Sequence, residues 1–417
     1  MRPRNIFVLL LAFFTVFQAK SSDTLRITIR QADSMFLANN YNLLAMAMNI
    51  DAQKAQIIQA KLYPNPTLTA EFNVFDPQHG EILHINKTGQ KSFQIDQLFL
   101  LGGKRKAQID LAKTNYQIAE LEFQDLVRQL IFQLHTRLYF INEQAFLIAK
   151  YNQQLILLDT ILNAYEVQVT KGNLPLKDLV RLKGVYLNLN NERAAIFKVY
   201  FDEIAAVQAI IQTNKVISPI ITDAEVAACV KTITLSSLND TALTNRPDYL
   251  ITQKNIILAE QYFSFQKKMG IPDVHLYGVY DQRGGAFVNQ SNFGFSIPLS
   301  LWNRNQGNIK TAEYQLKQSN YNADAQRIQL LSEIQSNYLM YTQTVIEYKK
   351  TKLLYTNEFE TTLKGMSDNF QKGNVSLIEF VDFFEGYNDA LAEVARIKIQ
   401  LATSAELINL SVGKRIF

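Results

Sequence analysis

The chain has 417 residues, a formal net charge of +4, nine prolines, sixteen glycines and one cysteine. Three basic residues, Arg2, Arg4 and Lys20, lie in the first 21 positions without an acidic residue, so the remainder carries about +1 (4 less 3). That charge does not indicate a nucleic-acid-binding protein, the lone cysteine excludes an internal disulfide, and so few prolines and glycines favour long uninterrupted elements.

The N-terminus has the pattern of a secretory signal peptide, residues 1–21. Arg2 and Arg4 precede an apolar run from Ile6 to Phe17, and the small-x-small site Ala19-Lys20-Ser21 follows. The run is too short for a transmembrane helix, which needs about 20 residues. The alternative is a buried N-terminal helix. We expect an exported protein, without a lipid anchor because Cys229 is far from the cleavage site.

The first half of the chain, residues 22–212, reads as helix, two strands and two more helices. Apolar residues recur at three- and four-residue steps up to Pro64 and Pro66, which end the first helix. Alternating apolar and polar residues then predict strands, and a long apolar stripe predicts a helix on the order of 100 Å long. The predicted elements are a helix over 28–61, strands at 67–75 and 92–100 around a polar loop 76–91, a long helix at 104–168 and a helix at 176–212.

The second half, residues 245–417, repeats this order. The tripeptide Lys-Gly-Asn occurs at Lys171 and again at Lys372, 201 positions later, and each copy breaks a helical stretch. The predicted elements are a helix at 246–269 capped by Asn245, strands at 273–281 and 292–299, a long helix at 308–370 and a helix at 376–410. Residues 213–244 lack periodicity and are expected to be an irregular linker, or equatorial, subdomain.

The four strands have the length and alternation of membrane-barrel strands. A tilted strand crosses a membrane in about 9–11 residues, with apolar side chains outward and polar side chains inward. Four strands cannot close a barrel, and open edges in lipid leave backbone groups unpaired. Three chains would supply twelve strands. The alternative is a small soluble sheet beside a helical body.

This order of elements resembles the TolC family of outer-membrane efflux channels, over nearly the whole chain after residue 21. The most specific motifs are Leu37-Ala38-Asn39-Asn40-Tyr41-Asn42-Leu43 with its counterpart around Asn245-Arg246-Pro247-Asp248, Tyr63-Pro64-Asn65-Pro66, and Leu101-Gly102-Gly103-Lys104-Arg105. The last motif is similar to the branch that serves cobalt–zinc–cadmium resistance pumps.

The resemblance implies a mainly α fold with a β-barrel part: a homotrimer whose twelve-stranded barrel lies in the outer membrane. Long coiled-coil-like helices would form a tunnel across the periplasm. The two Gly-containing turns would form its inner tip and meet a periplasmic adaptor protein and, through it, an inner-membrane pump, RND type favoured. The loops 76–91 and 282–291 would face outside.

The resemblance also assigns roles at the two tips. The expected adaptor-docking residues are Gly172, Asn173, Leu174, Gly373, Asn374 and Val375. The expected pore-gate residues are Asp178, Phe370, Glu379 and Asp382. Phe370 occupies the place of a gate tyrosine, and Val375 stands where family members carry an arginine that helps to tie the tip shut, so that tie is absent. The alternative for the carboxylates is a solvated acidic helix face.

Other chemistry is not indicated by the sequence. Gly102-Gly103-Lys104 lacks the rest of a phosphate-binding loop, no nucleophile motif is present, and no enzyme or cofactor is expected. His79 and His84 are expected to be surface loop residues, without zinc-ligand spacing, so no metal site is expected. Lys104, Arg105 and Lys106 would be solvated or meet lipid headgroups.

The expected function is therefore a passive outer-membrane exit duct of a tripartite efflux system that conducts heavy-metal cations, or drugs and organic compounds. Alternatives are the outer-membrane component of type I protein secretion and a non-conducting trimeric coiled-coil surface protein. A periplasmic helical enzyme lacks a site.

Overall fold

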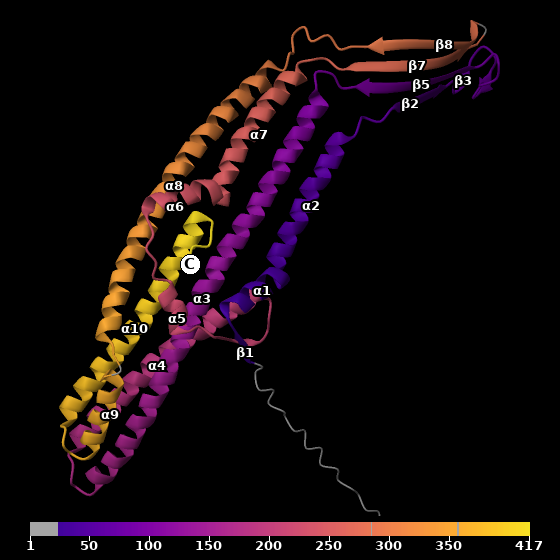
Figure 1. Ribbon diagram of the computed structural model, residues 1–417. Coiled ribbons are helices and arrows are strands. Elements are labelled where there is room, and N and C mark those ends of the chain that lie inside the picture. The colour runs from indigo at the N-terminus through magenta and orange to yellow at the C-terminus, as the bar shows by residue number, and fades with distance from the viewer. Residues whose placement is uncertain (1–23, 285, 357) are drawn as a thin grey trace, which may run out of the picture.

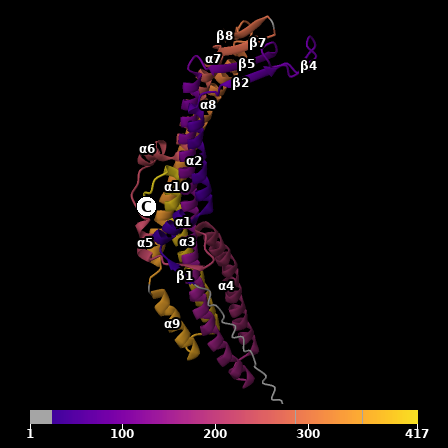
Figure 2. The same ribbon diagram turned by 90° about the vertical axis from the view of Figure 1, so that its right-hand side faces the viewer.

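The computed structural model describes residues 24–284, 286–356 and 358–417; the predicted signal peptide lies outside this range. The molecule is elongated, with a long helical body and a sheet at one end (Figure 1). Viewed from the side, the body is narrow, and α4 and α9 lie toward opposite sides of it (Figure 2). The mainly helical class with four sheet strands and an internally repeated element order is confirmed.

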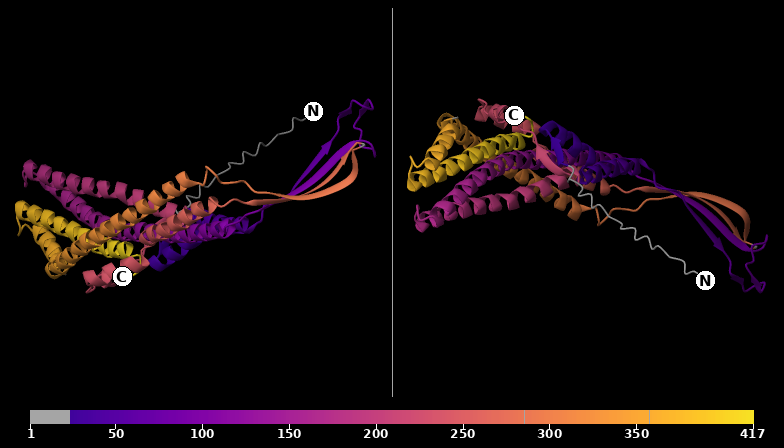
Figure 3. Two further views of the ribbon diagram at one scale, coloured as in Figure 1. Left: turned by 90° about the horizontal axis from the view of Figure 1, so that it is seen from above. Right: turned by 90° about the horizontal axis from the view of Figure 1, so that it is seen from below.

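One helix determines the length of the body. α3 (Lys104–Thr170) has 67 residues, which corresponds to about 100 Å at ~1.5 Å per residue. It packs against the other long helices: α2 (Tyr41–Lys61), α4 (Leu176–Ile211), α7 (Pro247–Met269) and α10 (Leu377–Val412). α8 (Gln306–Leu354) packs between α7 and α10. The two helical hairpins end together at one end of the molecule, and the strands lie at the other (Figure 3).

The helix predicted over 308–370 is in fact two. α8 ends at Leu354 and α9 (Glu358–Gln371) begins after a short break. The amide of Phe359 donates to the carbonyl of Thr356 at 3.1 Å, and the Thr356 hydroxyl donates to Glu358 at 3.2 Å. A threonine followed by acidic residues is a helix-start signal, which the apolar periodicity on either side masks.

The helix predicted over 28–61 also divides. α1 (Ile29–Asn39) ends at Asn40, which then caps α2: its carbonyl Oδ1 accepts from the amide of Leu43 at 3.1 Å. The Asn40 side chain is buried and also donates to the carbonyl of Ile210 at 2.8 Å. The same asparagine therefore turns the chain and fastens α1–α2 to the end of α4.

The second-half counterpart differs from the prediction. The residue before α7 is Arg246, not Asn245, which is the last residue of α6 (Leu235–Asn245). Arg246 is buried; its guanidinium donates to Asp248 at 2.8 Å and to Glu333 at 2.8 Å, and to the carbonyl of Ser411 at 3.2 Å. Pro247 at the first helical position is favourable because it needs no partner for its nitrogen.

The segment 213–244 was expected to be irregular, but it forms regular elements. It contains β6 (Val216–Pro219), α5 (Asp223–Ala228) and most of α6. β6 pairs in parallel with β1 (Thr24–Ile27), which the sequence analysis did not predict. These elements are too short for a period to emerge, and they pack on the middle of the helical body, where Ile217, Val226 and Leu238 are buried in the main core.

The sheet is antiparallel in the order β2-β5-β7-β8. Its strands are β2 (Thr67–Phe72), β5 (Gln90–Phe99), β7 (Val274–Arg283) and β8 (Phe287–Ser296). The predicted strand 67–75 ends early because the chain leaves the sheet after Phe72 and forms a second hairpin, β3 (Phe75–Asp76) with β4 (Glu81–Ile82). The join between β5 and β7 brings the two halves of the chain together in one sheet.

Two separate cores hold the helices. The first lies in the middle of the body and contains buried residues of α1, α3, α4, α8 and α10 together with the linker elements. The second lies toward the hairpin ends and contains residues of α3, α4, α9 and α10, among them Leu158, Leu182, Phe380 and Phe384. The second core therefore lies beside both Gly-containing turns.

Candidate functional site

The two Lys-Gly-Asn turns have the same geometry. After α3, Gly172 has φ +76°, its amide donates to Val169 and the amide of Asn173 donates to Gln168. After α9, Gly373 has φ +77°, and the corresponding amides donate to Phe370 and Asn369. This is the Schellman ending, for which glycine is favoured because a left-handed conformation strains any residue with a Cβ.

The predicted docking residues lie on these turns. Gly172, Asn173, Gly373 and Asn374 are exposed, and Leu174 and Val375 are half-buried at equivalent positions. Each asparagine side chain also donates back to the residue five positions earlier, Gln168 or Asn369. The structure therefore presents two matched rigid turns at the same end of the body.

The three predicted gate carboxylates differ in their surroundings. Asp178 is half-buried in the first turn of α4. Glu379 is exposed, and its carboxylate accepts from the amide and the hydroxyl of Ser376 at 2.9 and 2.8 Å, a capping box that lowers the pKa of Glu379 through those hydrogen bonds. Asp382 is also exposed, with 69% of its side chain accessible. The second turn therefore presents more accessible negative charge.

Phe370 lies inside the molecule. Its ring is 4% exposed and is stacked between Phe380, with ring centroids 4.5 Å apart, and Tyr165, with centroids 5.5 Å apart. A side chain that lines an opening would be exposed in the single chain. In this conformation Phe370 supports the second turn from within, at the contact of α9 with α3 and α10.

One residue at the tips was missed by the sequence analysis. Arg181 of α4 lies 4.0 Å from Asp382 of α10, measured from guanidinium nitrogen to carboxylate oxygen. The 201-residue offset of the repeat makes Arg181 and Asp382 equivalent positions. These opposite charges at equivalent positions of the repeat could have been found in the sequence. They form an ion pair between the two hairpins, which the uncharged side chain of Val375 cannot do.

The sheet has one apolar and one polar face. Cross-strand partners place Leu68, Ile95, Gly278 and Phe293 in one row of the first face, and the same face carries Phe72, Phe93, Tyr280 and Phe295. The opposite face carries Thr69, Gln94, Val279 and Asn292 in one row. The apolar side chains are exposed, 72% for Leu68 and 75% for Phe293, so this face is not covered by the helical body.

The outer edges of the sheet are free within the described chain. β2 pairs only with β5, and β8 pairs only with β7. Unpaired edges are templates for another strand. An uncovered apolar face between two free edges is suited to continue into a larger closed sheet.

The junction of sheet and helices is held by the basic residues after Gly103. Lys104, expected to be solvated or at lipid headgroups, is instead buried; its ammonium lies 2.8 Å from Asp273 and donates to the carbonyl of Ile271 at 2.6 Å. Arg105 lies over the ring of Tyr63, 4.1 Å from its centroid. A short turn with two positive-φ glycines, Gly102 and Gly103, brings these groups to the second half of the chain.

None of the helices among the described residues is both long and apolar enough to span a membrane.

Comparisons with known proteins agree with this geometry. Residues 238–414 match the family described as outer membrane efflux protein. No curated protein matches the chain.

Similar solved structures cover nearly the whole chain. CusC, in structures that describe transmembrane channel formation, has a TM-score of 0.75 at 15% identity, over 93% of this chain and 92% of that one. A membrane protein from Pseudomonas aeruginosa has 0.74 at 15%, over 94% and 92%. The CmeC outer membrane channel of Campylobacter jejuni has 0.74 at 13%, over 92% and 85%. At these identities the likeness shows the fold.

Proposed function

We propose that this chain is the outer-membrane exit duct of a tripartite efflux system, because residues 238–414 match the family described as outer membrane efflux protein and the chain has the fold of solved outer-membrane channels along its length. The sheet would lie in the outer membrane, and the helical body would extend into the periplasm. The duct would conduct passively, with the energy supplied by an inner-membrane pump.

The features of the sheet are the main support for this proposal. It has an exposed apolar face, a polar face and two free edges, and an open sheet is not stable in lipid because its edge amides and carbonyls lack partners. Pairing β8 of one chain with β2 of the next, three times, closes twelve strands with the apolar face toward lipid and the polar face toward a lumen. The repeat places the two turns of each chain at the far end, six in a trimer.

Cross-linking of the two free edges tests this arrangement. With buried Cys229 replaced by alanine, cysteines at Thr69 of β2 and Asn292 of β8 should let a short flexible bis-maleimide join neighbouring chains, because both residues are exposed on the polar face. We expect a ladder on a denaturing gel that ends at three chains.

The single-cysteine variants are the control and should give at most dimers. A ladder that continues beyond three chains, or the absence of cross-links in the double variant in membranes, contradicts the closed trimer.

The second turn should carry more of the gate than the first. Replacing Glu379 and Asp382 with alanine is expected to change single-channel conductance, or its block by divalent cations, more than replacing Asp178, since the two are exposed and Asp178 is half-buried. Rings of carboxylates at a pore mouth attract cations, and Asp382 also pairs with Arg181.

Charge must be separated from helix capping in this experiment. Glutamine at position 379 preserves the capping box with Ser376 but removes the charge, so Glu379→Gln with Asp382→Asn should reproduce the effect of the alanine variants. Asp178→Asn is the matched comparison. A larger effect of Asp178→Asn reverses the expected order and rejects the asymmetry.

Partners and cargo follow from the same proposal. We propose that the turns at Gly172 and Gly373 dock a periplasmic adaptor and that the pump is of the RND type. Heavy-metal cations are the favoured cargo, because the segment from Leu101 to Arg105 is similar to that of the cobalt–zinc–cadmium branch; drugs and organic compounds are the second candidate.

A further inference from the structure

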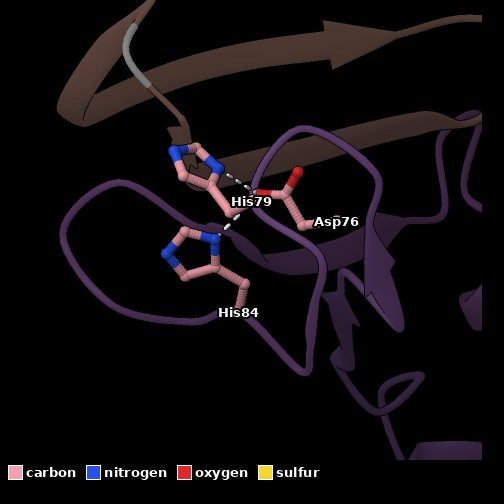
Figure 4. A group of neighbouring side chains, drawn as sticks. All are labelled: Asp76, His79 and His84. Atoms are coloured by element: carbon pink, nitrogen blue, oxygen red, sulfur yellow. Dashed lines mark hydrogen bonds and ion pairs between the residues drawn. The ribbon is translucent and has the colours of Figure 1, made fainter.

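Three side chains with metal-ligand chemistry converge in the loop between β2 and β5 (Figure 4). Asp76 ends β3, His79 lies in the turn that follows, and His84 follows β4. One possible ligand atom from each residue lies within 4.8 Å of the other two. This cluster is far from the two tips, at the end of the sheet away from the helices (Figure 1).

Both imidazoles aim a nitrogen at the same carboxylate oxygen. The Nδ1 of His79 lies 2.9 Å from Oδ2 of Asp76, and the Nδ1 of His84 lies 2.7 Å from it. The rings are nearly perpendicular, with centroids 4.9 Å apart. Two nitrogens therefore converge on one carboxylate oxygen from different directions, and the three potential ligand atoms lie together.

The backbone and the neighbouring residues hold these ligands in place. The amide of Gln78 donates to Oδ1 of Asp76 at 2.9 Å, and the amide of Gly80, which has φ +68°, donates to the Asp76 carbonyl at 2.8 Å. The Nε2 of His84, on the far side of its ring, lies 3.0 Å from the Thr88 hydroxyl. Ligating histidines typically have such a partner on their second nitrogen, which fixes the ring.

The three side chains differ in how far they are exposed to solvent. The side chains of His84 and Asp76 are 4% and 12% exposed, whereas that of His79 is 48% exposed. The fold thus holds His84 and Asp76 in place. The third residue, His79, lies at the solvent side, where it can bind an incoming ion. His84 was expected to be a surface residue; it is buried because β3 and β4 fold the loop over it.

We propose that Asp76, His79 and His84 form a binding site for one divalent transition-metal ion of the zinc class. Zinc–nitrogen and zinc–oxygen bonds are about 2.0–2.2 Å, so atoms now in hydrogen-bond contact need to separate by less than about 1 Å, which small ring rotations provide. Water would take the fourth position from the open side. Imidazole ligands select zinc, copper or nickel over magnesium and calcium, which prefer oxygen ligands.

A second histidine–aspartate pair, in the sheet, serves as a control for the metal-binding test. His275 of β7 lies 2.8 Å from Asp96 of β5, and its side chain is 42% exposed, close to that of His79. That pair lacks a second histidine among the described residues within metal-ligand reach. If a lone hydrogen-bonded pair were enough for binding, His275→Ala would have the same effect as His79→Ala.

Metal titration of the full-length protein in detergent, after treatment with a chelator, tests the site. We expect one Zn²⁺ per chain by calorimetry, at least tenfold weaker binding in His79→Ala and Asp76→Asn, unchanged binding in His275→Ala, and no saturable binding of Mg²⁺. Co²⁺ used as the probe should give visible absorption bands of a tetrahedral site, and His79→Ala should lose them.

Two results would overturn the proposal: no stoichiometric Zn²⁺ binding by the unmodified chain, or equal affinity in His79→Ala. Because His79 is half-exposed, we expect His79→Ala to fold normally. His79→Gln is a second variant, which keeps a polar side chain of similar length. The test does not depend on the proposed duct function, because it measures binding to the purified chain and not conduction.

Discussion

Replacing Phe293 with arginine is expected to prevent stable assembly in the outer membrane. Phe293 lies near the middle of β8 on the apolar face, 75% exposed in the single chain. In a closed barrel this side chain faces lipid, where an arginine near the midplane costs about 2–4 kcal/mol per chain. Three copies per trimer multiply the penalty. The measurement is the yield of heat-resistant trimer in the outer-membrane fraction.

The neighbouring position provides the matched control. Asn292 is also exposed but lies on the polar face, so Asn292→Arg should leave the trimer yield nearly unchanged. In a soluble sheet beside a helical body both arginines would be solvated and both variants would behave alike. Equal yields for the two variants would therefore remove the main support for a membrane barrel.

Replacing His135 with alanine is expected to destabilise the middle of the helical body by about 3–5 kcal/mol. His135 of α3 is 1% exposed; its Nδ1 lies 2.8 Å from Glu406 of α10, and its Nε2 lies 2.6 Å from Asp33 of α1. Removal of the imidazolium leaves two carboxylates, one of them buried, without their common partner. Denaturant unfolding of the purified protein, followed by circular dichroism, measures the loss.

The same residue gives the stability a definite pH dependence. Burial by itself would lower the pKa of His135, but the hydrogen bonds that its protonated ring donates to Asp33 and Glu406 outweigh burial and raise the pKa to about 9 from the ordinary 6.5. A raised pKa stabilises the fold fully below pH 6.5, and this contribution, about 3 kcal/mol by linkage, is lost as the pH rises to about 9.

His275→Ala is the control for both effects. Its ion pair with Asp96 is partly exposed, and such pairs contribute about 0–1 kcal/mol. The His135 variant should lose the pH dependence between 6.5 and 9, whereas the His275 variant should retain it. A wild-type stability that stays level or increases over that range would contradict a protonated, buried His135.

The repeat and the strand faces were predictable because their signals are local and periodic. Alternation in residues 292–299 assigned Phe293 and Phe295 to one face, and cross-strand pairing confirms it. Lys-Gly-Asn predicted two turns, and both have a left-handed glycine in the same ending. A period of two or of about 3.6 residues survives in a sequence whatever the chain packs against.

Other features depend on contacts that no period records. The burial of Phe370 follows from stacking on Tyr165 of a different hairpin, 205 positions away. The approach of Asp76 and His84 follows from the early end of β2 and the extra hairpin β3–β4. Lys104 is buried because Asp273, from the other half of the chain, lies beside it.

Planar-bilayer recording of the trimer, purified from the outer-membrane fraction, tests the duct most directly. We expect discrete single-channel currents whose size or cation block changes in Glu379→Gln with Asp382→Asn, and whose appearance is lost in Phe293→Arg. A soluble monomer, or a membrane-bound trimer that never conducts with or without the gate substitutions, would contradict the proposed duct function.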